Sequence, residues 1–200
     1  LVTNEREKID FDALPNRFVI KATHGSGWNI LVRDKNRIDK AAIVAQCRKW
    51  LGSVYGVSLK EHHYKDIPPA ILIEEFLTDQ RHDIPLDYKF FVFHGRCHFI
   101  QVDYARFSEH TRTFYSPEWE PQDFTLMQQS TVIQERKPAT LTRMIEVAET
   151  LAKDIDFCRV DLDSINEQDV YFGEMTLTPE GGSGRFSPTS KADFLMGSLW

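Results

Sequence analysis

The sequence predicts an α+β protein whose antiparallel sheets form two lobes. Three pairs of apolar, β-branched and aromatic runs, each joined by a polar turn, indicate hairpins at residues 18–33, 87–106 and 157–177. Two further segments, 39–51 and 140–155, repeat their apolar residues at helical spacing. Because a hairpin pairs antiparallel strands, these runs build antiparallel sheets, and the helices supply apolar faces that pack on them.

A polar, proline-containing stretch at residues 78–86 marks the boundary between the lobes. We therefore expect a connector at residues 1–16, a small lobe at 17–77 and a large lobe at 78–200. With 200 residues and 42% hydrophobic content, the chain is long enough for such lobes to have a real core.

Composition excludes some classes of partner. A formal net charge of −6 argues against nucleic acid as the main partner, because phosphate backbones are bound through clustered lysine and arginine. The three cysteines, Cys47, Cys97 and Cys158, lie within apolar runs, which is typical of reduced core thiols and favours the cytoplasm. No apolar stretch is long enough for a membrane helix, and the first residues lack a signal-peptide pattern. The chain begins with Leu1 rather than Met, and we expect that a segment is missing before it.

The first hairpin carries a glycine-rich turn, THGSGWN, at residues 23–29. Gly25 and Gly27 lack a Cβ atom, so the amides of the turn can approach a bound group closely and cradle phosphate oxygens. The turn has neither the Walker pattern nor the spacing of a dinucleotide fingerprint, so a plain hairpin turn explains it equally well. Lys21, on the strand just before the turn, favours phosphate.

A helix and a strand follow this hairpin. Asp39 is placed to cap the helix that begins after it. The strand at residues 70–77 is apolar as far as Ile73 and then abruptly acidic at Glu74 and Glu75.

The second hairpin contains a charged residue among aromatic ones. Alternation along DYKFFVF places Asp87, Lys89, Phe91 and Phe93 on one face of the strand. Two interpretations of Lys89 are open: its side chain extends to the edge of the sheet, or it reaches into a cleft and contacts phosphate or substrate. The stretch that follows, residues 107–137, is rich in loops and has no clear period, so we assign it no role.

The third hairpin places carboxylates in the middle of two neighbouring strands. On the first strand, Arg159 and Asp161 share a polar face opposite an apolar one. On the second, the same alternation groups Phe172, Glu174 and Thr176. If the two polar faces coincide, two carboxylates and a neutral oxygen converge, and such ligands suit Mg²⁺ beside nucleotide phosphates. The alternative is a solvated face with an arginine and a glutamate paired across the strands.

The order of these motifs resembles the ATP-grasp fold, in which two α+β lobes clasp a nucleotide. More narrowly, the segments HGSGWNILV, DYKFFVFHG and EMTLTPEGG resemble the TupA-like ATP-grasp family, which is associated with bacterial envelope polysaccharides and teichuronopeptide synthesis. The resemblance covers nearly the whole chain.

The resemblance implies positions for a nucleotide and a metal ion. Lys21 corresponds to the lysine that contacts the nucleotide phosphates, and Arg159 to the arginine that stabilises the phosphoryl group in transfer. Thr176 stands where most members have asparagine, and its single oxygen is a weaker metal ligand. The implied lid comprises His24, Gly25, Ser26 and Gly27 and continues to Asn29; the adenine-binding linker comprises Glu74, Glu75, Phe76 and Leu77; the ribose-binding acid is Asp87; and the metal carboxylates are Asp161 and Glu174.

The resemblance also implies the reaction. ATP phosphorylates a substrate carboxylate, and an amine then attacks the acyl phosphate to give an amide, ADP and phosphate. Mg²⁺ on the two carboxylates, together with Lys89, Arg159 and the lysine before the lid, would supply most of the rate enhancement. The acceptor would lie near Arg106 and a second glycine cluster at 181–187, where Arg185 is either a carboxylate-binding fork or a surface residue.

The implied protein is an ATP-dependent carboxylate–amine ligase that uses ATP and Mg²⁺. Its partners would be a small-molecule or saccharide carboxylate and an amine such as an amino acid, and the sequence gives no basis for an oligomeric state. Two alternatives stay open: an ATP-dependent phosphotransferase on the same fold, since the phosphate site is shared, and a nucleotide-binding module without turnover, which the threonine at position 176 favours.

Overall fold

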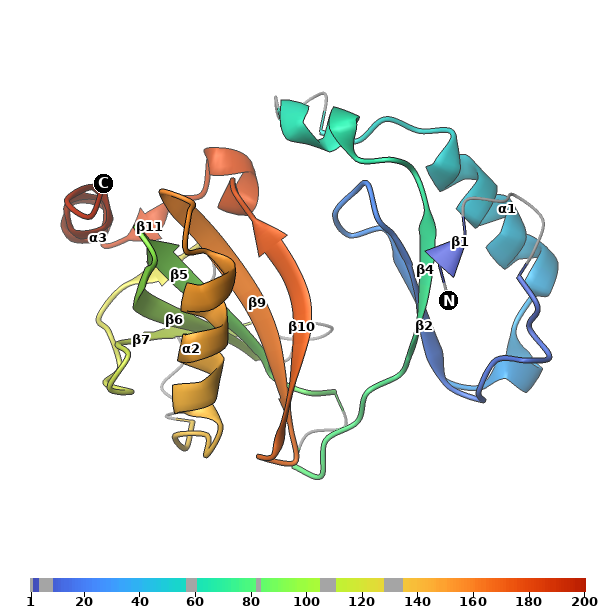
Figure 1. The fold of residues 1–200 in the computed structure, drawn as a ribbon, viewed down its shortest axis with the longest axis horizontal. Helices are drawn as coiled ribbons and strands as arrows, with labels where there is room; N and C mark the ends of the chain where they lie inside the picture. The colour runs from blue at the N-terminus through green and yellow to red at the C-terminus, as the bar shows by residue number, and fades with distance from the viewer. Residues whose placement is uncertain (1, 4–8, 57–60, 82–83, 105–110, 128–134) are drawn as a thin grey trace. The chain divides into compact units, whose positions relative to one another are not determined.

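The computed structural model describes residues 2–3, 9–56, 61–81, 84–104, 111–127 and 135–200. The chain divides into two compact units, Leu1–Phe76 and Leu77–Trp200. Each unit has its own antiparallel sheet and its own apolar core (Figure 1).

In the part of the chain that the structure describes, no helix has the length and apolar character needed to cross a membrane.

The first unit is a four-stranded sheet in the order β1-β4-β2-β3, with helix α1 on one face. Phe18 and Ile20 alternate along β2 and pack against Trp50 of α1. The side chain of Asp39 accepts a hydrogen bond from the backbone N–H of Ala42 at 2.9 Å, which confirms the predicted helix cap. The elements are β1 (Val2–Thr3), β2 (Phe18–Ala22), β3 (Asn29–Val32), the 3-10 helix η1 (Lys35–Arg37), α1 (Lys40–Leu51), the 3-10 helix η2 (His62–Asp66) and β4 (Ile71–Glu75).

The second unit is built on a five-stranded antiparallel sheet in the order β10-β9-β5-β6-β7. Helix α2 packs against β5, β6 and β9 on one face, and a short β8–β11 pair and helix α3 contribute to the core on the other face. The elements are β5 (Asp87–Phe93), β6 (Arg96–Tyr104), β7 (Thr111–Tyr115), β8 (Thr125–Leu126), α2 (Leu141–Leu151), β9 (Phe157–Ile165), β10 (Asp169–Thr176), the 3-10 helix η3 (Pro179–Gly182), β11 (Phe186–Ser187) and α3 (Thr189–Gly197).

Strand β5 lies at the centre of this sheet, and all of its residues are buried. Phe90 belongs to the core beneath α2, as the alternation predicts. On the opposite face, Phe91 and Phe93 belong to the apolar cluster that also contains residues of β8 and α3. Asp87 and Lys89 project from this same face of the strand, and both are buried. This face is therefore apolar toward one end of the strand and charged toward the other. The charged end provides the polar groups that a binding or catalytic site needs.

The prediction that Phe172 shares a face with Glu174 is wrong. Strand β10 carries a bulge between these two residues, so Phe172 pairs with Leu162 while Glu174 pairs with Asp161. The extra residue is Gly173, where an added Cβ would lie 3.1 Å from the backbone oxygen of Asp161. A bulge moves the following residues to the other face of the strand, and glycine accommodates the close approach.

The stretch at residues 107–137 is more regular than the sequence analysis allowed. Among its described residues it contains the strands β7 and β8, and β7 forms one edge of the large sheet by pairing with β6. Strand β8 pairs with β11.

Candidate functional site

A row of polar side chains crosses the face of the large sheet that α2 does not cover. Backbone pairing places Gln101 opposite Lys89, Lys89 opposite Asp161, and Asp161 opposite Glu174. Directly opposed residues in antiparallel strands project to the same face. The row therefore assembles side chains from four strands, and three of its members were predicted as site residues. We call Asp87, Lys89, Arg159, Asp161, Glu174 and Thr176 the central charge cluster.

Lys89 bridges two carboxylates inside this cluster. Its Nζ atom donates to Oδ2 of Asp87 and to Oδ2 of Asp161, both at 2.6 Å. The side chains of Lys89 and Asp161 are only 6% and 5% exposed. The ammonium group is therefore held within the cluster and does not extend to the edge of the sheet. Its contact with phosphate or substrate stays a prediction.

Arg159 joins the carboxylates of β9 and β10. Its Nε and Nη2 atoms form a fork on Asp161, with both contacts at 2.7 Å. The same Nη2 donates to Oε1 of Glu174 at 3.0 Å and to the hydroxyl of Thr176 at 3.1 Å. The two predicted metal carboxylates and the predicted third ligand therefore converge on one nitrogen atom.

The cluster holds more negative than positive charge. Counted by formal charge, the carboxylates of Asp87, Asp161 and Glu174 stand against the cations Lys89 and Arg159, which leaves −1. Burial raises the pKa of Asp161 to about 6, although both cations act to lower it. Burial acts to lower the pKa of Arg159, but the charge of Asp161 holds it above its ordinary value. The guanidinium stays charged, and an added cation would offset the excess.

The cluster offers part of the donor set that Mg²⁺ uses in proteins. Among the described residues, no group of three or more histidine, cysteine, aspartate or glutamate side chains is arranged to hold a metal ion. The cluster offers a pair of carboxylates, and Mg²⁺ is commonly held by one or two carboxylates with water and phosphate oxygens in its other positions. Glu174 is half-exposed and accessible, whereas both oxygens of Asp161 already accept hydrogen bonds that a cation would share or replace.

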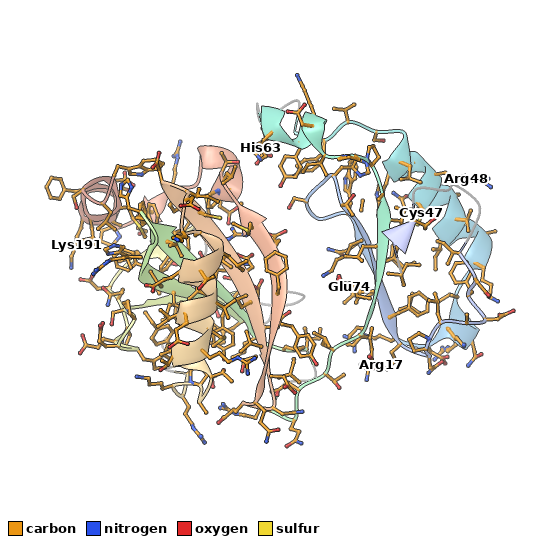
Figure 2. The ribbon with its side chains drawn as sticks, viewed as in Figure 1. Arg17, Cys47, Arg48, His63, Glu74 and Lys191 are labelled. Carbon is orange, nitrogen blue, oxygen red and sulfur yellow. The ribbon has the colours of Figure 1, made fainter. Side chains whose placement is uncertain are left out.

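In the first unit, Lys21 pairs with Glu74 rather than standing alone. Both lie on the sheet face opposite α1, since Ile20 of β2 and Ile73 of β4 face the core. The Nζ atom of Lys21 lies 2.8 Å from Oε1 of Glu74, and the two side chains are 41% and 35% exposed. Figure 2 shows Glu74 on β4 and Cys47 on α1, on opposite sides of the strand. The ammonium group of Lys21 is therefore accessible from solvent.

The other predicted linker residues have different surroundings. Glu75 is exposed, and Phe76 is buried beneath the guanidinium of Arg17, which lies 4.4 Å from the ring centroid. Leu77 begins the second unit. Within the first unit, the structure therefore pairs Glu74 with Lys21 and places Phe76 in a cation–π contact.

The glycine-rich turn is anchored at both of its ends. His24 is buried, and its Nε2 atom lies 2.8 Å from the backbone oxygen of Trp50, with its ring edge-on to Trp28. A Cβ added to Gly25 would lie 2.7 Å from the Trp28 ring, so only glycine fits there. Ser26 and Gly27 form the exposed tip. Of the four predicted lid residues, the tip and the backbone are therefore available to a ligand, while the histidine ring is used for packing.

A second buried ion pair was missed by the sequence analysis. Arg112 on β7 donates from Nε to Asp103 of β6 at 2.7 Å, and from Nη1 to Glu180 of η3 at 3.0 Å. Its strand, TRTFY, is β-branched or aromatic at every position but Arg112, and this enrichment could have identified β7. Arg106, which was predicted to contact the acceptor, lies outside the described residues, and Arg185 is exposed.

Comparisons with known proteins place this chain among ATP-grasp sequences. The family described as TupA-like ATPgrasp matches residues 1–200. A comparison with curated proteins finds no match.

This chain is similar to part of several solved structures. One is D-alanine–D-alanine ligase from Bacillus anthracis complexed with ATP, with 14% identity, a TM-score of 0.48, and coverage of 91% of this chain and 52% of that one. Another is the ATP-grasp ligase PsnB complexed with a minimal precursor, with 12% identity, a TM-score of 0.45, and coverage of 88% and 44%. This chain therefore spans about half the length of these structures.

Proposed function

The chain belongs to the TupA-like ATP-grasp family and has the α+β ATP-grasp fold, and we propose that it forms part of an ATP-dependent carboxylate–amine ligase of bacterial envelope polysaccharide or teichuronopeptide synthesis. The observation that carries the proposal is the convergence of Asp161 and Glu174 on one nitrogen of Arg159. A buried cluster with an excess of negative charge and two fixed cations suits a metal–phosphate group.

In the proposed first step, an oxygen of the substrate carboxylate attacks the γ-phosphorus of ATP, and ADP leaves. Charge on the transferring group is stabilised by Arg159 and Lys89, which the cluster holds in place before the nucleotide arrives. Phosphoryl transfer depends mainly on positioning and charge neutralisation, so preorganised cations account for most of the rate enhancement.

In the second step, an amine nitrogen attacks the carbonyl carbon of the acyl phosphate, phosphate leaves, and the nitrogen loses a proton to give the amide. The chain's contribution is to orient the two substrates and to keep water from the acyl phosphate. We propose Arg106 and the segment at 181–187, including Arg185, as the acceptor side of the site.

A magnesium ion would be held by Glu174 and Asp161, with Thr176 contributing at most a weak hydroxyl contact. When bound, Mg²⁺ would supply positive charge that offsets the charge of the nucleotide phosphates.

In the proposed function, residues of the first unit make further contacts with the nucleotide. We propose that residues 17–77 act as the small lobe and 78–200 as the large lobe. Lys21 would exchange Glu74 for a phosphate, and the backbone at Gly25–Gly27 would line the phosphates. The linker Glu74–Leu77 would contact adenine, and Asp87 would contact the ribose.

The three free cysteines in the described chain are consistent with a cytoplasmic reaction.

Hydroxylamine trapping tests the proposal, because hydroxylamine converts an acyl phosphate to a stable hydroxamate. We expect ATP, Mg²⁺ and a panel of uronic and amino acids to give hydroxamate and ADP in equal amounts. Arg159→Lys should lower the rate by about 10² or more, because it removes the fork on the transferring charge.

Asp123→Asn is the matched control for this assay, since Asp123 belongs to an exposed ion pair with Lys191. ADP formation with a stable phosphoester in place of hydroxamate would make the protein a phosphotransferase. Nucleotide binding with no ADP release from any carboxylate would make it a binding module.

A further inference from the structure

Arg112 lies on the same face of the sheet as the central charge cluster. Pairing places Arg112 opposite Asp103, Asp103 opposite Asp87, and Gln101 opposite Lys89. Gln101 donates from Nε2 to Asp103 at 2.9 Å, so the contacts of Arg112 continue to the row that contains Lys89. Arg112, Asp103 and Gln101 are all buried.

The guanidinium of Arg112 is fixed from the sheet side. Asp103 accepts from its Nε at 2.7 Å and from its Nη2 at 3.4 Å, and the backbone oxygen of Leu126 accepts from Nη1 at 2.6 Å. A buried cation with these partners has a defined position. Its remaining contact, from Nη1 to Glu180 at 3.0 Å, reaches a side chain that is 34% exposed.

Glu180 belongs to a segment with unusual backbone geometry. Its φ angle is +52°, and Gly181 and Gly182 follow with φ of +63° and +69°. A glutamate pays about 1 kcal/mol or more for this left-handed conformation, so a specific contact must hold it there. The described residues give Glu180 such a side-chain contact in its ion pair with Arg112.

The position of this segment connects it with the proposed chemistry. Strand β10, which carries Glu174 and Thr176, forms one edge of the sheet, and β7, which carries Arg112, forms the other. Four strand spacings of about 4.8 Å separate the two edges. The chain from β10 to Glu180 therefore crosses the face that carries the central charge cluster, and Figure 1 shows η3 following the end of β10.

We propose that Arg112 is a positioning residue that, through Glu180, orders residues 178–183 as a wall of the substrate site beside Glu174. The proposal rests on the proposed ligase function, and it adds a residue of β7 that does not itself touch the reacting atoms. It assigns the segment to the binding of the carboxylate or amine substrate rather than of the nucleotide.

The test compares Glu180→Gln with Glu167→Gln. Glu167 is a matched control, because it also has a left-handed backbone, with φ of +56°, and is ion-paired to Arg81 and Arg136, in the turn between β9 and β10. Amide hydrogen exchange reports the order of the segment at Gly181, which bonds to Thr178, and at Ser183, which bonds to Glu180.

We expect Glu180→Gln to speed exchange at these two amides about tenfold, the factor given by loss of one charged hydrogen bond, while Glu167→Gln leaves them unchanged. In the hydroxamate assay, KM for the carboxylate or hydroxylamine should rise by a similar factor, with ATP affinity within about twofold of wild type. Arg112→Lys should have at least the effect of Glu180→Gln, because it also disturbs the contacts with Asp103 and Leu126. Adding Glu180→Gln to Arg112→Lys should have little further effect.

Unchanged exchange in Glu180→Gln would overturn the proposal. So would faster exchange with unchanged substrate kinetics, since the contact would then be structural alone. If the wild-type protein forms no hydroxamate, the proposed function fails and the substrate role of Arg112 fails with it, while the exchange result still decides whether Arg112 orders the segment.

Discussion

Two lysine–carboxylate pairs of the same chemistry occupy opposite environments in this molecule. Lys21 and Glu74 in the first unit are 41% and 35% exposed, whereas Lys89 and Asp161 in the second are 6% and 5% exposed. An exposed pair contributes little to stability and can exchange partners, while a buried one cannot lose a member without leaving an unpaired charge. The proposed phosphate contacts therefore differ: Lys21 is free to move to a ligand, and Lys89 is fixed in advance.

The strongest test of this comparison replaces each lysine by methionine. Lys89→Met should lower the free energy of unfolding of the second unit by about 3–5 kcal/mol, because Asp87 and Asp161 lose a shared cation. Lys21→Met should cost the first unit about 0–1 kcal/mol. Urea unfolding followed by hydrogen exchange of amides in β5 and β2 measures the two units separately. Equal losses would show that burial does not distinguish the pairs.

The reactivity of the cysteine thiols measures how each unit responds to loss of its lysine–carboxylate pair. Burial raises the pKa of the Cys97 thiol to about 12 and also raises the pKa of Cys158 and of Cys47. Reaction with a thiol reagent at pH 8 should therefore be slow in the native protein and depend on opening of each unit. Lys89→Met should speed labelling of Cys97 and Cys158 by about 10² to 10⁴, the factor that a loss of about 3–5 kcal/mol gives, and leave Cys47 nearly unchanged. Equal acceleration at Cys47 would argue against separate responses of the two units.

The bulge at Gly173 offers a change in geometry without a change in charge. In Gly173→Ala the new Cβ would lie 3.1 Å from the backbone oxygen of Asp161, so the two strands must separate by a few tenths of an ångström. We expect a loss of about 1–2 kcal/mol and weaker Mg²⁺-dependent ATP binding. Gly197→Ala is the control, because its Cβ meets nothing within 4 Å. Similar behaviour of the two variants in thermal unfolding would mean that the bulge does not hold Glu174 against Asp161.

Much of the central charge cluster was predictable because it depends on alternation within single strands. Side chains alternate between the two faces of a strand, and this rule alone places Lys89 on the face of Phe91 and Asp161 on the face of Arg159. The structure confirms both placements. The error at Phe172 had a local cause, since a glycine within a strand is itself a signal of a bulge.

Contacts between distant segments were not predictable in the same way. The pairing of Lys21 with Glu74 depends on the register of β2 against β4 across 53 residues, and that of Arg112 with Glu180 spans 68. Strand register is set by the packed core, which a single sequence does not display. The sequence therefore identified the charged groups, while the fold determined which of them lie in contact.

Titration calorimetry of ATP, with and without Mg²⁺, tests the central claim most directly, namely that the central charge cluster binds metal and phosphate. We predict tighter binding with Mg²⁺, and loss of that enhancement in Glu174→Gln, a half-exposed carboxylate whose replacement costs little stability. Asp123→Asn should behave as wild type. Mg²⁺-enhanced binding that is unchanged in Glu174→Gln would contradict the account, because the ion would then be held elsewhere.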